Sequence, residues 1–268
     1  MIGRMIKLKM LLIVLLLAGF TLPASARVEF WTYGLQDSRV ILPAAEDETP
    51  AAEFHMRYLY PMRGADTPLL EKLRRQCARS FFGRPVDSPS RALMEERDSW
   101  FGEYEDVCAE YDSNIGVFAY RWSMESLMSV RINEPGLIVL ENAEYLFTGG
   151  AHGVYGSDFT VIDPRSADTV GLEHLFPSSS VMKLGPMIER KILQELARRL
   201  DDNVSRDDLL TEKVEPTSNF YLTKKGVVFH YNVYEVAPYA AGEFDILLPF
   251  SEIRKLMRPE AYRRWAGR

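Results

Sequence analysis

Cysteine and histidine are scarce in this chain, and both shortages restrict its chemistry. The 268 residues include two cysteines, and four histidines at positions 55, 152, 174 and 230. The histidines have none of the short spacings typical of a zinc site, so we expect no metal and no cofactor, although a zinc site assembled only in three dimensions stays open. The Gly-x-Ser-x-Gly and His-Glu-x-x-His motifs of two large hydrolase classes are also missing.

Basic residues are too few to favour a nucleic-acid partner. The chain has 32 Lys and Arg against 38 Asp and Glu, a net charge of −6. Such a surface repels a phosphate backbone and tolerates a cationic ligand. Hydrophobic residues make up 47% of the chain, enough to bury a core without a stabilising metal. The length suits one large domain or two small ones, and the sequence leaves the oligomeric state undetermined.

Long apolar runs are absent except near the amino terminus, where residues 1–26 have the pattern of a secretory signal. Arg4, Lys7 and Lys9 precede an apolar run of residues 10–20, and small residues at 24 and 26 suit a cleavage site. A membrane anchor is the alternative, but the run is shorter than the roughly 20 apolar residues of a spanning helix. We therefore expect a periplasmic or secreted protein that starts near residue 27, with no stable membrane anchor after cleavage. Loss of the signal would leave 29 Lys and Arg against 38 Asp and Glu, or −9.

The two cysteines predict a disulfide, because an even number in an exported protein favours pairing. Cys77 and Cys108 each fall late in an expected helix and on its apolar face. A bond between them would clamp the two helices together. Two separate buried thiols are the alternative.

The order of helical and strand-like segments predicts an α+β fold, with an antiparallel meander packed by two or three helices. Apolar residues at helical spacing favour helices from residue 67 to 82 and from 90 to 111. Strand-like runs follow from residue 116 to 162, and a further helix is expected over 180–200. Strands joined by short turns favour antiparallel pairing. The expected organisation is a strand and loop segment over 27–56, one domain over 57–257, and a basic tail over 258–268.

Two motifs in the second half of the chain resemble a known family. The first reads Thr-Gly-Gly-Ala-His-Gly and contains Gly149, Gly150 and His152; the second spans residues 229–242. Together they resemble the extracytoplasmic domain shared by the lysozyme-sensing anti-sigma factor RsiV and the accessory module of PdaC-type peptidoglycan deacetylases, long catalogued as a domain of unknown function. The resemblance implies a cell-envelope ligand, either a lysozyme-like protein or peptidoglycan. The nine residues before the apolar run leave no sigma-binding region, so signalling through a sigma factor is not implied.

The motifs also supply the candidate site. Gly149 and Gly150 predict a tight reversal between two strands, because glycine adopts positive φ without steric cost. The histidine after them either fixes that turn or lines a binding groove with residues of the second motif. The expected groove residues are His152, Tyr155, Tyr231, Tyr234, Glu235 and Tyr239.

Three functions remain open from the sequence. The first is a non-catalytic envelope protein that binds a lysozyme-like or other envelope protein, since tyrosine suits protein hot spots. The second is a peptidoglycan or glycan-binding accessory domain, because tyrosine also stacks on sugars. The third is an unrecognised hydrolase in which His152 and Glu235 act as acid and base.

Overall fold

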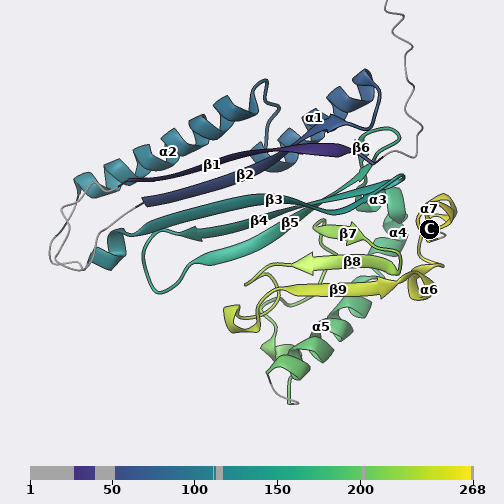
Figure 1. Ribbon diagram of the computed structural model, residues 1–268. Helices are drawn as coiled ribbons and strands as arrows, with labels where there is room; N and C mark the ends of the chain where they lie inside the picture. Colours follow the sequence, from purple (N-terminus) through teal and green to yellow (C-terminus); the bar gives the residue numbers. More distant parts are fainter. Residues whose placement is uncertain (1–26, 40–51, 111, 113–116, 201–202, 267–268) are drawn as a thin grey trace, which may run out of the picture.

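The computed structural model describes residues 27–39, 52–110, 112, 117–200 and 203–266, so the expected signal peptide over 1–26 lies outside the described residues. Within them, a six-stranded and a three-stranded sheet are each packed by helices (Figure 1). This arrangement confirms the predicted α+β fold. No helix in the described part of the chain is long and apolar enough to cross a membrane.

The larger sheet has its strands in chain order. They are β1 (Glu29–Arg39), β2 (Ala52–Arg63), β3 (Trp122–Glu134), β4 (Leu137–Phe147), β5 (Val154–Asp163) and β6 (Asp168–Thr169). All neighbours are antiparallel except β2 and β3, which are parallel because two helices lie between them in the chain. The predicted meander therefore starts at β3, and the first two strands form a separate hairpin beside it.

Helices α1 (Thr67–Phe82) and α2 (Pro89–Ala109) cover one face of this sheet, over β1 and β2 (Figure 1). The α1 helix begins where the Asp66 carboxylate accepts a hydrogen bond from the amide of Leu69, and it ends at Gly83 with φ 68°. Its buried residues are Leu70, Leu73, Cys77 and Ala78, and the first three belong to the apolar stripe that the 3.6-residue periodicity predicts.

The smaller sheet consists of β7 (Phe220–Leu222), β8 (Gly226–Tyr231) and β9 (Phe244–Pro249), and α5 (Gly185–Arg199) packs against β9. Its core extends into the larger sheet, because it includes Leu137, Val139 and Val161 from β4 and β5. The smaller sheet and α5 therefore lie against the face of β4 and β5 opposite to α1. Short elements complete the described chain: η1 (Val117–Tyr120), α3 (Leu172–Leu175), α4 (Ser178–Val181), η2 (Arg206–Asp208), η3 (Tyr239–Ala241), α6 (Phe250–Ile253) and α7 (Pro259–Trp265).

The expected disulfide is not formed. Cys77 and Cys108 are both free and buried, and they lie in different hydrophobic clusters. The physical reason is that the apolar faces of α1 and α2 both point at the sheet, at different places, rather than at each other. Burial raises the pKa of the Cys77 thiol to about 12 and raises the pKa of the Cys108 thiol as well, so both are protonated at neutral pH.

Three local predictions also differ from the structure. Where a strand was expected from residue 116, Val117–Tyr120 form the 3-10 turn η1, and β3 starts only at Trp122. The helix expected over 180–200 is split into α4 and α5 by a non-helical segment before Gly185. The basic tail contains α7, which buries Ala261 and Trp265 in the core beneath the smaller sheet.

Candidate functional site

The reversal predicted at Gly149 and Gly150 joins β4 to β5. Both glycines have positive φ, at 91° and 95°, in the range that disfavours any side chain. Gly149 is also packed tightly, since a Cβ there would lie 2.3 Å from the carbonyl oxygen of Ala119. Gly150 has open space around it. The hairpin tip is therefore fixed by conformation at both positions and by close approach of backbone at the first.

Apolar and aromatic side chains project from both faces of this hairpin near its tip. Tyr145 lies opposite Tyr155 across the two strands, and Leu146 lies opposite Val154. Tyr145, Leu146 and Val154 are 37%, 45% and 50% exposed. Alternation along a strand puts the two tyrosines on the face toward the smaller sheet and the two aliphatic residues on the other face. Gly153 allows the Tyr145 ring to lie against the backbone of the tip, because a Cβ at residue 153 would lie 2.5 Å from that ring.

A second turn, over residues 232–235 after β8, brings another tyrosine to the same place. The amide of Glu235 donates to the carbonyl oxygen of Asn232, and the Glu235 carboxylate accepts from the amide of Asn232. Within this turn Tyr234 has φ 68°, a left-handed conformation that is uncommon for a non-glycine residue. The turn leaves its ring 49% exposed. Strained residues that present a side chain to solvent are often part of a binding site.

The two motifs meet in a group of four rings, here called the tyrosine cluster: His152, Tyr155, Tyr234 and Tyr239. Tyr239 is at its centre. The His152 ring stacks on it at 4.3 Å between centroids, Tyr155 meets it edge-on at 5.6 Å, and Tyr234 is tilted against it at 5.4 Å. The Tyr239 hydroxyl donates to the carbonyl oxygen of Gly153 at 3.0 Å. Four of the six expected groove residues thus form one surface.

Tyr231 is not part of this surface, contrary to the prediction. It is buried on β8 at 4% exposure, and its hydroxyl donates to the carbonyl oxygen of Glu215. All six residues of β8 are buried, and Tyr231 lies with Val227 and Phe229 in the core of the smaller sheet. Glu235 lies beside the cluster, but its carboxylate stabilises the 232–235 turn.

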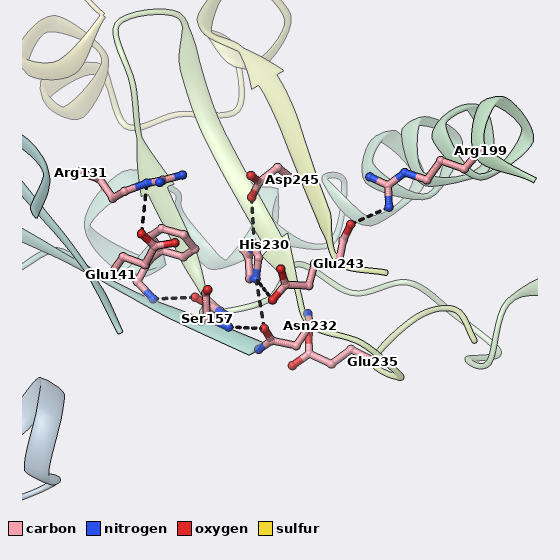
Figure 2. Close-up of polar contacts among 11 residues, drawn as sticks. Arg131, Glu141, Ser157, Arg199, His230, Asn232, Glu235, Glu243 and Asp245 are labelled. Atoms are coloured by element: carbon pink, nitrogen blue, oxygen red, sulfur yellow. Dashed lines mark hydrogen bonds and ion pairs between the residues drawn. The ribbon is translucent and has the colours of Figure 1, made fainter. Parts of the chain in front are cut away.

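Beneath the cluster, two asparagine side chains connect the sheets. Along the unpaired stretch of the β5 edge, Asn219 accepts from the amide of Phe159 at 2.9 Å and donates to the carbonyl oxygen of Ser157 at 2.7 Å. Asn232 accepts from the amide of Ser157 at 2.7 Å (Figure 2). The side-chain amides of the two asparagines therefore bond the backbone of β5 where a neighbouring strand would otherwise do so. Gly156 permits this approach, because a Cβ there would lie 2.7 Å from Oδ1 of Asn232.

The buried histidine of the second motif belongs to the same connection. Nδ1 of His230 lies 2.9 Å from a carboxylate oxygen of Asp245, and Nε2 lies 3.1 Å from Oδ1 of Asn232 (Figure 2). Both partners present acceptor oxygens, because Oδ1 of Asn232 already receives the Ser157 amide, so the site favours the cationic form with hydrogen on both ring nitrogens. Burial disfavours that charge, but the hydrogen bond and charge of Asp245, the Asn232 oxygen and Glu243 outweigh it and raise the His230 pKa.

The pKa values of the two carboxylates beside His230 are shifted in opposite directions. Burial raises the pKa of Glu243, and one of its oxygens is buried without a hydrogen bond. Burial also acts to raise the pKa of Asp245, but the bond and charge of His230 outweigh burial and lower it. Asp245 is therefore the anion that pairs with the imidazolium. The imidazole is buried at the junction of the sheets, since His230 is 4% exposed, whereas its partner Asp245 is exposed on the outer side.

A polar hollow of about 640 Å³ lies beside the tyrosine cluster, at the same end of the larger sheet. Its inward side chains come from one cross-strand row and the row next to it: Gln36, Ser38, Glu53, His55, Ser123, Glu125 and Tyr145. Nδ1 of His55 lies 3.0 Å from a carboxylate oxygen of Glu125. Sequence analysis missed this hollow because its residues come from four strands. The sequence did contain one indication of it, Tyr145, which lies opposite the predicted groove residue Tyr155 in the expected hairpin.

The described residues contain no group of three or more His, Cys, Asp or Glu side chains arranged to hold a metal ion. The arrangement offers stacking surfaces, hydroxyl groups and exposed apolar side chains. Those groups suit the binding of another molecule.

Comparisons with known proteins relate part of the sequence, and the fold, to one family. Residues 174–251 match the sequence profile of the family described as "Protein of unknown function (DUF3298)". Among curated proteins nothing matches. A solved DUF3298 family structure from Bacteroides fragilis is 23% identical, with 87% of this chain and 95% of that chain covered and a TM-score of 0.73. One from Pseudomonas aeruginosa PAO1 is 22% identical, with 87% and 96% covered and a TM-score of 0.57. The chain thus carries a segment of DUF3298 type in its carboxyl-terminal half, and its fold is that of solved structures from this family.

Proposed function

We propose that this protein is an exported, non-catalytic binding protein that recognises a basic protein of the cell envelope through the tip of the β4–β5 hairpin. The observation that carries the proposal is the exposure of Tyr145 and Tyr234 beside the tyrosine cluster, together with Leu146 and Val154 on the other face of the same hairpin tip. Exposed apolar and aromatic side chains at the tip of one hairpin are typical of a protein interface, and tyrosine is common among residues that dominate binding.

Charge supports a basic ligand. The net charge is −6 for the chain and would be −9 without the expected signal peptide. Opposite charge accelerates encounter and makes association sensitive to ionic strength. The resemblance to the lysozyme-sensing domain of RsiV points to the same class, a lysozyme-like or other cell-wall-active protein.

The test is titration calorimetry of the purified protein against hen egg-white lysozyme. We expect Tyr234→Ala to weaken binding by about 2 kcal/mol, roughly thirtyfold, because its ring belongs to the tyrosine cluster and is exposed. Met182→Ala is the matched control, since Met182 is 58% exposed directly after α4, outside the tyrosine cluster. Absence of lysozyme binding, or equal affinity of Tyr234→Ala and the wild type, would refute this assignment.

The polar hollow supports a second candidate, the binding of peptidoglycan or a related glycan. It combines amide, hydroxyl, imidazole and carboxylate groups with one aromatic side wall, Tyr145, and none of its lining residues is Lys or Arg. Sugars are bound by this combination of hydrogen-bonding groups and a stacking ring. Co-sedimentation with purified peptidoglycan tests it: Gln36→Ala and Glu125→Gln should release the protein, whereas Tyr234→Ala should not.

The geometry gives a hydrolase less support. Nδ1 of His152 lies 3.0 Å from the carbonyl oxygen of Gly153, and the ring is stacked on Tyr239. The Glu235 carboxylate is bonded to the amide of Asn232. Both groups thus have structural partners. The double variant His152→Ala with Glu235→Gln distinguishes the classes, because it would abolish turnover in an enzyme and only weaken binding in an adaptor.

A further inference from the structure

The first strand of the larger sheet has an open edge. β1 pairs with β2 along its whole length, and no other described strand pairs with its outer side. It is eleven residues long, about twice the usual length of a strand. Every second residue along such an edge directs its amide and carbonyl groups outward, so the edge is a template for another strand.

The usual protections of an open edge are weak here. β1 contains no proline and no lysine, and seven consecutive residues, Phe30 to Gln36, are uncharged. Its one irregularity is a register shift between Glu29 and Phe30, at the end of the strand. Trp31 is 61% exposed. Long, uncharged and aromatic edges of this kind pair with other strands unless something covers them.

The charges of β1 select its partner. Glu29 and Arg39 lie at opposite ends of the strand, each five residues from Gly34. In an antiparallel pair of two copies centred on Gly34, Glu29 of each copy would lie opposite Arg39 of the other. A shift of two residues, the smallest that keeps each side chain on its own face, places Glu29 opposite Asp37 in one direction. In the other direction it leaves Glu29 with no opposite residue in β1. Within one copy Glu29 already pairs with Arg63 and Arg39 with Glu105, so in the centred register the charges of the two copies would form a network at each end of the strand. One register is therefore favoured by charge.

We propose that two copies of this chain associate through β1, antiparallel and centred on Gly34, so that their larger sheets join into one. The centre accommodates close contact, because Gly34 has no side chain and is exposed. Tyr33 of one copy lies opposite Leu35 of the other, and both are half-buried residues that pack under the helices.

The helices fit this arrangement. α2 contacts both β1 and β2, so its axis lies over the outermost pair of strands. In the joined sheet, both copies of α2 lie on the same face. α2 lies over the Leu35–Arg39 half of β1, where it contacts Asp37 and Arg39, so the two copies of α2 lie on either side of the centre at Gly34.

A charge swap tests the pairing and its register. Sedimentation equilibrium of the wild type should give twice the monomer mass. Glu29→Arg and Arg39→Glu should each weaken the dimer by about tenfold, because by symmetry each change creates two like-charge contacts. The double variant Glu29→Arg with Arg39→Glu restores both opposite-charge contacts and should return the dimer to within about threefold of the wild type. A monomeric wild type, or a dimer indifferent to all three variants, overturns the proposal.

A cysteine at the centre gives an independent readout. A Cβ at Gly34 has only ordinary contact with its surroundings, 3.7 Å from the carbonyl oxygen of Met56, so Gly34→Cys should fold. In the proposed dimer the two new thiols lie opposite each other, within reach of a disulfide. Thr32→Cys is the control, because its two copies would lie about 13 Å apart along the strands. The native cysteines are buried and do not compete. Air oxidation should crosslink only Gly34→Cys; equal crosslinking of both variants, or of neither, refutes the register.

Discussion

The Asn232 side chain connects the two sheets, and its removal gives the most direct test of that connection. The change Asn232→Ala deletes Oδ1, which accepts from the amide of Ser157 and from Nε2 of His230. Loss of the acceptor for a neutral amide costs about 1 kcal/mol, and loss of the acceptor for a buried cationic ring costs about 2 kcal/mol. The expected decrease in the free energy of unfolding is therefore about 3 kcal/mol.

Urea unfolding followed by circular dichroism near pH 6 measures this decrease, and a thermal scan should show a melting temperature lower by roughly 6–12 °C for a chain of this size. Asn232→Asp is the matched control. Its carboxylate keeps an acceptor for both donors and adds charge opposite to the imidazolium, so it should lose less than about 1 kcal/mol. The reasoning fails if Asn232→Ala costs under about 1 kcal/mol, or if the aspartate variant is as unstable as the alanine variant.

Three further predictions concern the turn, the thiols and pH. Gly149→Ala should lower the melting temperature more than Gly150→Ala, because only the first adds a clash with backbone to the cost of positive φ; equal losses would mean that φ alone matters. Cys77 and Cys108 should both resist Ellman's reagent in the folded protein and both react in guanidinium, and rapid reaction of either folded thiol would contradict their burial. His230 has a folded pKa above its unfolded value, so its stabilisation is complete below about pH 6.5 and is lost as pH rises through the folded pKa. Unfolding free energies at pH 6 and 8.5 should differ more in the wild type than in His230→Asn, and equal differences would show that the ring is neutral.

Local patterns were sufficient for the helices and the hairpin. The apolar stripe of α1 follows from the spacing of Leu70, Leu73 and Cys77, because a helix on a sheet buries one stripe. The positive φ values of Gly149 and Gly150 follow from the steric cost of a side chain in a tight reversal. Each of these predictions depends on residues close in sequence.

The errors came from contacts between distant segments. Tyr231 was placed in the groove with the rest of its motif, but it shares one face of β8 with Val227 and Phe229, and that face is buried in the core. The apolar position of Cys108 was read correctly, yet the surface that it meets belongs to the sheet and not to α1. Likewise, nothing local indicates that the strands divide into two sheets joined by Asn219 and Asn232.

The tyrosine cluster could be predicted in part, for a physical reason. The sequence placed its members at strand ends, and rigid sheets present binding residues there. The ring contacts with Tyr239 depend on η3, a short turn with no signal of its own. The hollow beside the cluster depends on registers among four strands, which hydrophobic pattern does not determine.

The shared core of the two sheets affects how this fold can be divided. The segment that matches the DUF3298 profile, residues 174–251, contains α5 and the whole smaller sheet. Its interior is closed by Leu137, Val139 and Val161, which precede it, and by Trp265, which follows it. Cut out at the profile boundaries, the segment would expose that interior to water. The unit of sequence similarity is therefore smaller than the unit of cooperative folding, and an expression fragment should start no later than β3 and continue through α7.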